Sequence, residues 1–212
     1  MILTENLTVN AHSSIRIQDG NRVIYIDPFQ IKKETHDADF ILITHDHYDH
    51  FSPEDIVKVA KPDTILVVPG TMMGKAREVA GSVGDIRMVK QDESGDISGL
   101  TYETIPAYNV GKNFHQKNAG WVGYILTLGG KRIYIAGDTD RNSDNEKVKC
   151  DIALVPIGGT YTMDAKEAAE LINLIQPEVA IPVHYGSVVG SKSDATGFSK
   201  NVKAPVKVEI KL

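Results

Sequence analysis

The chain contains few of the features that would place a protein outside the cytoplasm or in a membrane. Cys150 is the single cysteine in 212 residues, so no disulfide can form within the chain and nothing demands an oxidising compartment. No run approaches the ~18 consecutive apolar residues of a membrane-spanning helix, and residues 1–10 have neither a basic start nor a long apolar stretch. These absences predict a cytoplasmic chain with no membrane segment and no export signal.

Positive charge is also in short supply. Lys and Arg number 23 against 28 Asp and Glu, which gives a formal net charge of −5, and no basic stripe runs along the sequence. Nucleic acid is therefore not an expected partner. The chain has no evident linker, repeat or low-complexity tract, and its 42% hydrophobic content supplies a substantial core, so we predict one domain over residues 1–212. These features leave the oligomeric state open, with a homo-oligomer as one outcome.

What the chain does contain is a high density of metal-ligand residues in one short segment. Residues 45–50 hold three histidines and two aspartates. Residues 39–44 form a short apolar run typical of a buried strand, and Ser52-Pro-Glu-Asp55 begins a helix with an N-cap serine and a proline in the first turn. The cluster is therefore predicted on a strand-to-helix loop, where α/β folds commonly place active sites.

The spacing inside this cluster indicates two ions rather than one. His45 and His47 lie two residues apart, so in an extended segment their side chains share one side and can approach the same ion. Asp49 and His50 follow after the chain begins to turn, where they suit a second ion nearby. A polar loop that merely caps the helix is the alternative interpretation, but it does not explain four potential ligands at this spacing.

The segment Thr44-His-Asp-His-Tyr-Asp-His50 resembles the His-x-His-x-Asp-His signature of the metallo-β-lactamase superfamily, a group defined by its fold and metal site rather than by one substrate. The resemblance implies that His45 and His47 bind one metal ion and that Asp49 and His50 bind a second. It also implies further ligands from later loops. The implied fold is a four-layer αβ/βα sandwich, with two mixed β-sheets flanked by helices.

Two later positions match the ligands that this resemblance requires. Asp138 follows a predicted strand at 132–136 within Gly-Asp-Thr, which is similar to the motif whose carboxylate bridges both metals in the family. Taken alone, an aspartate after a glycine would be read as a turn residue. His184 ends the apolar run 178–183 and is similar to the last ligand of the second metal.

The third ligand of the first metal has two candidates, His115 and Asn109. We favour His115, because it precedes two predicted strands, 121–128 and 132–136, that lead to the Gly-Asp motif as in the family. Imidazole is also a better ligand than a neutral amide for zinc or another first-row ion. The glycine-rich sequence that surrounds this histidine in many family members is absent here, so Asn109 stays an alternative.

Five further residues are candidates for supporting the metals or binding substrate. His12, in Ala11-His-Ser, resembles the Gly-His-Ser stretch of a subgroup of small lactonase-like and phospholipase-D-like hydrolases, although alanine replaces the glycine; a structural histidine is the alternative. Asp27 has a family counterpart that hydrogen-bonds around the metal loop, and it could equally open an Asp-Pro turn. Tyr161 could donate to a developing oxyanion or lie in a flexible turn. Tyr185, like Tyr48, could contact substrate or brace the ligand loop.

Two lysines flank the predicted ligand His115. Lys112 and Lys117 could attract an anionic substrate, and a solvated loop is the alternative interpretation. His36 lies in a polar, acidic segment and is interpreted as a solvated loop residue. Cys150 lies beside a predicted strand in no catalytic context, so we interpret it as a packing residue rather than a nucleophile.

Hydrophobic periodicity predicts many strands and three helices. The strands are expected near 14–18, 22–27, 39–43, 64–68, 86–89, 100–105, 121–128, 132–136, 152–155, 178–183 and 206–211. The helices are expected near 53–60, 71–80 and 164–176, and the last has an acidic capping box at its start and Pro177 beyond its end. Early strands in succession, followed by strands that alternate with helices, fit an α+β arrangement of two packed sheets covered by helices.

The predicted function is metal-dependent hydrolysis of a small metabolite. Two divalent ions can lower the pKa of a shared water to about 7, so a metal-bound hydroxide would attack a lactone, ester, amide or phosphodiester. Zinc is favoured, with manganese, iron or nickel as alternatives. Asp49, Asp138 and Tyr161 are the predicted catalytic residues. The alternative function is a metal-binding regulatory or binding protein without turnover.

Overall fold

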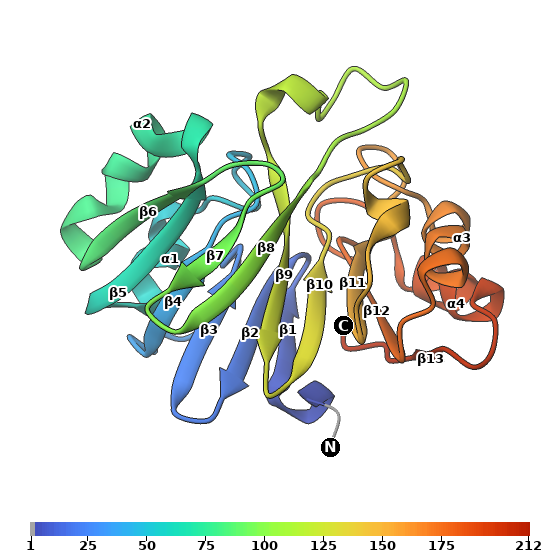
Figure 1. Ribbon diagram of the computed structural model, residues 1–212, viewed down its shortest axis with the longest axis horizontal. Coiled ribbons are helices and arrows are strands. Elements are labelled where there is room, and N and C mark those ends of the chain that lie inside the picture. Colours follow the sequence, from blue (N-terminus) through green and yellow to red (C-terminus); the bar gives the residue numbers. More distant parts are fainter. Residues whose placement is uncertain (1–2) are drawn as a thin grey trace.

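The computed structural model describes residues 3–212, so the first two residues of the predicted 1–212 domain lie outside it. Two β-sheets face each other in the centre of the molecule, and helices cover the outer face of each sheet (Figure 1). The layers therefore run helix, sheet, sheet, helix. The predicted fold class, an α+β sandwich of two mixed sheets flanked by helices, is confirmed.

The first sheet has the strand order β1-β2-β3-β4-β5-β6. Its first three strands are antiparallel neighbours, and β3 to β6 are parallel. The strands are β1 (Leu7–Ala11), β2 (Ser14–Asp19), β3 (Arg22–Ile26), β4 (Ala38–Leu42), β5 (Ala60–Pro69) and β6 (Asp85–Val89).

The second sheet repeats this plan in the order β13-β12-β11-β10-β9-β8-β7. Strands β7 to β10 are antiparallel neighbours, and β10 to β13 are parallel. The strands are β7 (Ser94–Ile97), β8 (Leu100–Pro106), β9 (Val122–Leu128), β10 (Lys131–Ile135), β11 (Ile152–Pro156), β12 (Val179–Val183) and β13 (Lys207–Val208).

Four α-helices begin and end within residues 3–212, two beside each sheet (Figure 1). They are α1 (Pro53–Val59) and α2 (Met73–Ala76) on the first sheet, and α3 (Ala165–Ile175) and α4 (Lys192–Asn201) on the second. Short 3-10 turns occupy Leu3–Asn6, Gly70–Met72, Arg77–Ser82, Lys117–Ala119 and Asn145–Lys147. The predicted caps are present: the Ser52 side chain accepts from the Asp55 amide, and Asp164 accepts from two amides at the start of α3.

Apolar side chains form three buried clusters that correspond to the three interfaces between layers. The central cluster joins the inner faces of both sheets, and the other two lie under α1 and α2 and under α3 and α4. Strands β11 and β12 are buried along their whole length, which explains why they are continuous apolar runs in the sequence. Covered on both faces, these strands give a rigid support to the loops that follow them.

Some predicted elements differ from the structure. The predicted helix 71–80 is a four-residue α-helix between two 3-10 turns, and the predicted strand 206–211 is reduced to two residues. Helix α4 lies in a stretch that hydrophobic periodicity leaves unassigned, because only Ala195 and Phe198 of its side chains are buried. Its capping box, Ser191 and Asp194, is the signal that would have indicated it. Strands β1 and β7 are likewise not predicted; β7 is an edge strand with largely exposed side chains.

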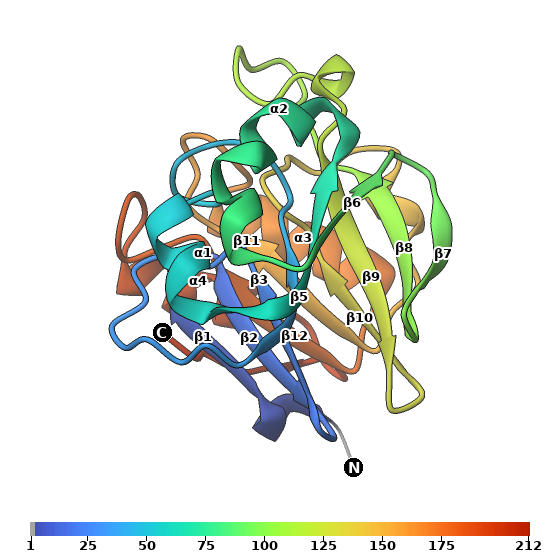
Figure 2. The same cartoon turned by 90° about the vertical axis from the view of Figure 1, so that its left-hand side faces the viewer.

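The loops that carry the predicted ligands gather at one edge of the sandwich. They follow the carboxyl ends of β4, β8, β10 and β12, and the segment between β8 and β9 rises above the rest of the molecule in both views (Figures 1 and 2). Within residues 3–212, no helix has the length and apolar character needed to cross a membrane.

Candidate metal centre

The loop after β4 forms a tight turn at the edge of the sandwich. The amides of His50 and Phe51 both donate to the carbonyl of His47, at 3.0 and 2.7 Å. The start of the loop is joined to the second sheet, because the Val122 amide donates to the Thr44 carbonyl at 3.2 Å. This is the strand-to-helix turn that the sequence predicts, and it changes chain direction between His47 and His50.

Two groups of side chains converge at the carboxyl ends of β4, β10 and β12. In each group, one potential ligand atom from every member lies within 4.8 Å of the others. The first group consists of His45, His47, His115 and Asp138, and the second of His12, Asp49, His50 and His184. The structure therefore brings together all seven predicted metal ligands and adds His12 to the second group; their role as ligands stays a prediction.

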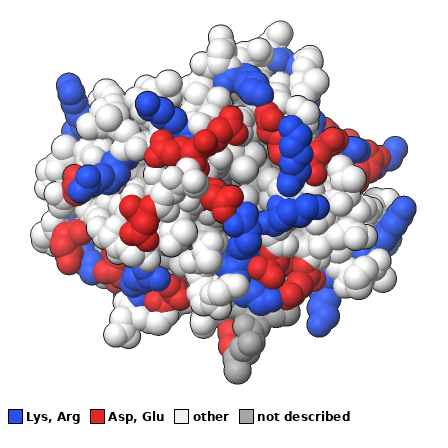
Figure 3. Space-filling model, in the orientation of Figure 1, with Lys and Arg blue, Asp and Glu red and all other residues white. Residues whose placement is uncertain are grey.

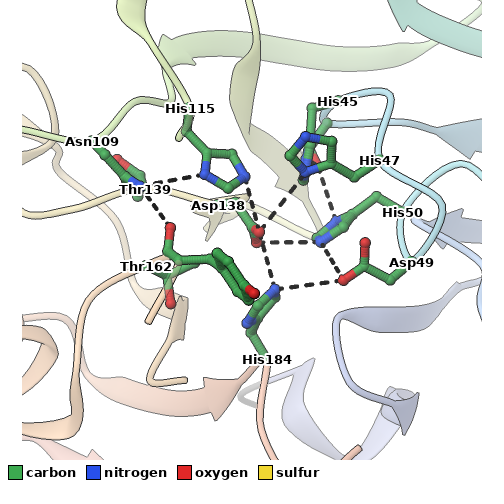
Figure 4. A network of polar contacts seen from close by, with 12 residues as sticks. His45, His47, Asp49, His50, Asn109, His115, Asp138, Thr139, Thr162 and His184 are labelled. Atoms are coloured by element: carbon green, nitrogen blue, oxygen red, sulfur yellow. Dashed lines mark hydrogen bonds and ion pairs between the residues drawn. The ribbon is translucent and has the colours of Figure 1, made fainter. Parts of the chain in front are cut away.

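The carboxylate of Asp138 connects the two groups (Figure 4). Its Oδ2 lies 3.2 Å from His115 Nε2 and 3.0 Å from His184 Nε2, while its Oδ1 lies 3.2 Å from His50 Nε2. One carboxylate thus faces histidines of both groups. A ligand with two oxygens in this position suits a bridge between two ions.

The donor set fits divalent metal ions. Among the described residues, Nε2 of His50, His115 and His184 and Oδ1 of Asp138 are buried and make no hydrogen bond of good geometry. Buried polar atoms without a partner are costly, so an unpaired group of this kind calls for an ion or water. Imidazole nitrogens and carboxylate oxygens are the ligands that zinc and related ions prefer.

Asp27 holds the ring of His50 from behind. The Asp27 carboxylate is 1% exposed and accepts from His50 Nδ1 at 2.7 Å, from the Thr44 amide at 2.8 Å and from the Thr44 hydroxyl at 2.7 Å. In the neutral ring that an ion would require, a proton on Nδ1 leaves the Nε2 lone pair of His50 facing Asp138 and the centre. Asp27 therefore stands where the resemblance implies, next to the metal loop and outside the ligand groups.

Burial and neighbouring charges shift the pKa values of the site. Burial, together with the charge of His50, holds the pKa of His45 well below its ordinary value, so its imidazole is neutral. Burial alone would raise the pKa of Asp138, but His184 and His50 outweigh it and hold that pKa well below the usual range. Asp138 and Asp27 similarly overcome the burial of His50 and raise its pKa well above the ordinary value. The centre thus offers a permanent carboxylate charge to a cation.

His115 and Asn109 occupy different layers of the site (Figure 4). His115 Nε2 faces Asp138, whereas Asn109 lies behind the ring, with Nδ2 3.3 Å from His115 Nδ1. The same Nδ2 donates to the Tyr161 carbonyl at 2.6 Å. This geometry favours His115 as the ligand and gives Asn109 the task of connecting it to the Tyr161 loop.

His12 lies against the second group. Its Nε2 is 3.2 Å from Asp49 Oδ2, its ring centroid is 3.8 Å from that of His184, and its carbonyl accepts from the His184 amide at 3.0 Å. Burial lowers the pKa of His12 below its ordinary value, although its contact with Asp49 opposes that effect. Of the two interpretations left open by the sequence, the one beside the metals fits this position.

The backbone is strained at several of these positions. His12, Asp27, His115 and His184 have φ values of 52°, 47°, 54° and 58°, in the left-handed region that non-glycine residues rarely adopt. Such conformations cost of order 1–3 kcal/mol each and persist where the surrounding structure enforces them, commonly at functional sites. No pattern in the sequence indicates this strain.

A glycine permits the close packing around His184. A Cβ on Gly158 would lie 2.6 Å from the His184 carbonyl oxygen, 2.6 Å from Val189 Cγ2 and 3.0 Å from His184 Nδ1. Any side chain at this position would therefore displace the histidine or its neighbours. The loop that carries Tyr161 thus begins with a packing constraint at Gly158.

The two groups open into a pocket of about 310 Å³. Five of its nine lining residues carry potential metal ligands, and the other four are Tyr48, Phe114, Tyr161 and Val188. Tyr161 therefore lies in the pocket, as its predicted role requires. Phe114 and Val188 were not predicted, because loop residues without a charge or metal-binding group give no signal in the sequence. Tyr185 does not line this pocket; it is 1% exposed and packs in the cluster beneath α3 and α4.

The lysines beside His115 are engaged elsewhere. Lys112 donates to Asp140 Oδ1 at 2.5 Å and to the Thr162 carbonyl at 2.7 Å, and Lys117 donates to Asp144 Oδ2 at 2.6 Å. Neither lines the pocket. Lys112 is therefore neither an unpaired cation nor a merely solvated side chain. It joins its own loop to the loops that carry Asp140 and Thr162.

His36 and Cys150 agree with their interpretations. The half-exposed His36 ring contacts only the Ala60 carbonyl and Glu34, away from the centre. Cys150 packs against the cluster beneath α3 and α4, and burial raises the pKa of its thiol to about 12.

The sandwich and its converging histidines and aspartates are the fold and donor set of a metallo-β-lactamase-type protein. A family model described as "Beta-lactamase superfamily domain" matches residues 6–184, and the chain belongs to this family. The predicted superfamily is thereby confirmed.

Individual relatives agree with this assignment, and their description as metal-dependent hydrolases confirms the prediction of an enzyme. A UPF0173 metal-dependent hydrolase of Symbiobacterium thermophilum is 33% identical over 207 residues, covering 91% of this chain and 89% of the relative. A Parabacteroides distasonis protein whose crystal structure is described as a metal-dependent hydrolase is 30% identical, with a TM-score of 0.82 over 97% of this chain and 92% of its own. The metallo hydrolase Igni18 of Ignicoccus hospitalis shares the fold, with a TM-score of 0.78 at 24% identity over 96% of this chain and 93% of its own.

Proposed function

We propose that this chain is a binuclear metal-dependent hydrolase of a small metabolite and cleaves a lactone, ester, amide or phosphodiester. The observation that supports a binuclear site is the position of Asp138, whose two carboxylate oxygens face histidines of both ligand groups. A single ion would leave the buried imidazole nitrogens of one group without a partner.

The residues that would hold the ions follow from the two groups. The first ion would be held by His45, His47 and His115 and the second by Asp49, His50 and His184, with Asp138 shared between them. When bound, such ions supply Lewis acidity and lower the pKa of water to about 7. Zinc is favoured by this donor set, with manganese, iron or nickel as alternatives.

The chain's own side chains orient the reaction and limit its substrate. Asp27 keeps the His50 proton on Nδ1, and the Tyr161 side chain lines the pocket, where its hydroxyl could donate to an oxygen that gains charge. For an ester or lactone, the oxygen of water adds to the carbonyl carbon, the acyl C–O bond breaks and the alcohol oxygen takes the proton. The volume of about 310 Å³ is at the small end of ligand pockets, which suits a small metabolite.

A nucleic-acid substrate is not part of this proposal. Lys and Arg side chains are intermingled with Asp and Glu on the face shown in Figure 3, rather than gathered in a stripe. The formal net charge of −5 also disfavours a polyanion.

The test combines metal content with turnover. The purified chain loaded with zinc is expected to hold two ions by mass spectrometry and to hydrolyse members of a panel of lactones, thioesters, amides and phosphodiesters. Asp138→Ala should lose bound metal and turnover together, because it removes the residue that faces both groups. A wild type that binds metal and turns over nothing beyond what Asp138→Ala does would instead support a binding or regulatory protein.

A further inference from the structure

The part of the pocket that is free to touch a substrate is uncharged. Apart from the predicted metal ligands, the lining consists of Tyr48, Phe114, Tyr161 and Val188. We call these four side chains the apolar wall. They come from four separate loops, which follow β4, β8, β11 and β12, so both sheets contribute to the wall.

Two rings of the apolar wall are exposed to a degree that is unusual for aromatic side chains. Tyr48 is 66% exposed and Phe114 is 46% exposed. The Phe114 ring meets Tyr161 edge to face, with ring centroids 4.9 Å apart, which fixes its orientation beside the pocket. Large apolar groups that face water beside a reactive site gain contact when a ligand covers them.

The two lysines that flank His115 are paired with groups of the protein and are not directed into the pocket. The Lys112 ammonium group is directed at Asp140, the Thr162 carbonyl at 2.7 Å and the Gly159 carbonyl at 3.4 Å, which accounts for its three protons. Lys117 is paired with Asp144 and lies 4.7 Å from the centre of the Tyr108 ring. No Lys or Arg is among the residues that line the pocket.

We infer that the substrate carries an uncharged aromatic or branched apolar group, which lies against Phe114, Tyr48 and Val188 while the bond to be cleaved faces the metal ligands. This assignment of substrate class rests on the proposed function. A substrate with a carboxylate or phosphate on the same side would lose hydration against the apolar wall and gain no cation in return. The pocket volume of about 310 Å³ restricts the group to roughly a single ring or a short branched chain.

The first experiment measures binding without turnover. Phenylacetohydroxamic acid and succinic monohydroxamic acid offer the same metal-binding group, and one carries a phenyl ring where the other carries a carboxylate. Titration calorimetry on the zinc-loaded chain is expected to show that the phenyl compound binds at least about tenfold more tightly. Equal or tighter binding of the carboxylate compound would overturn the inference.

The second experiment uses phenylacetate and hemisuccinate esters of one phenol. The wild type should show a kcat/KM at least about tenfold higher for the phenylacetate, and Phe114→Ala should lower that value about tenfold, mainly through KM, with unchanged zinc content. Val110→Ala is the matched control, because Val110 lies on the same loop, is 59% exposed and does not line the pocket.

The two proposals fail in distinguishable ways. If the zinc-loaded wild type hydrolyses neither ester nor any other member of the panel, the proposed hydrolysis fails, and the hydroxamate titration still decides which group the pocket prefers. If both esters are hydrolysed equally well, or if Phe114→Ala behaves like Val110→Ala in both experiments, hydrolysis stands and the apolar wall has no role in specificity.

Discussion

Replacing Asp27 by asparagine should weaken binding of one metal ion without changing any predicted ligand. The side chains have nearly the same shape, but both oxygens of Asp27 accept hydrogen bonds, Oδ1 from the Thr44 amide and Oδ2 from His50 Nδ1 and the Thr44 hydroxyl. An amide has only one accepting oxygen, and if that oxygen stays on the Thr44 amide, its nitrogen faces His50. An amide nitrogen opposite Nδ1 favours the tautomer with its proton on Nε2, which occupies the lone pair that faces Asp138.

The expected magnitude follows from the contacts that the carboxylate makes. Asp27 accepts three hydrogen bonds, at 2.7 to 2.8 Å, and the substitution removes the charge-assisted one to the metal-facing histidine. Losing such an outer contact typically lowers metal affinity by about 10–100-fold, which corresponds to about 1.4–2.7 kcal/mol. We expect the ion held by His50 to be lost first.

The assay is equilibrium dialysis against a zinc chelator, followed by measurement of the zinc-to-protein ratio. Asp39→Asn is the control, because Asp39 also accepts a backbone amide, that of Val23, and pairs with Lys61, yet lies away from the centre. It should retain wild-type zinc affinity. If Asp27→Asn retains both ions with the affinity of the wild type, the assigned role of Asp27 is refuted.

Three further predictions concern packing, ligand identity and thiol reactivity. Gly158→Ala should lower both zinc affinity and the melting temperature, because its Cβ would collide with His184. Gly74→Ala is the control and should change neither appreciably, because a Cβ there meets nothing within 4 Å. Equal behaviour of the two variants would contradict the packing constraint. His115→Ala should reduce bound zinc more than Asn109→Ala, and the reverse order would exchange their roles. Burial raises the pKa of Cys150 to about 12, so only ~0.1% of its thiol should be thiolate at pH 9, and its reactivity should rise as the pH approaches 12. Labelling of the folded chain by a disulfide reagent at pH 9 as fast as labelling in guanidinium would contradict this.

The sequence was sufficient for features that depend on local pattern. The cluster after β4 is recognisable because a buried strand, a run of ligands and an N-cap at Ser52 follow one another directly. Helix α3 shows both of its ends in the sequence. The pairing of Lys112 with Asp140 and the contact of Asn109 with Tyr161 could not be predicted, because they join loops far apart in the chain and depend on how those loops meet.

The same dependence on how distant loops meet explains why the pocket lining could not be predicted from the sequence. Phe114 and Val188 acquire their place through the arrangement of loops around the donors, which no periodicity records. The position of His12 on His184 likewise depends on the two sheets facing each other. Helix α4 is a different case, because its capping box was present and the weakness of its apolar face concealed it.

The distribution of the donors over the two sheets has a consequence for how the protein folds. Each ligand group takes members from the first sheet's loops, at residues 12 and 45–50, and from the second sheet's loops, at residues 115, 138 and 184. Neither half of the chain could assemble a complete site alone, and contacts this distant in sequence form slowly. Metal affinity would therefore report the docking of the two halves, and saturating metal would stabilise that docked state by mass action.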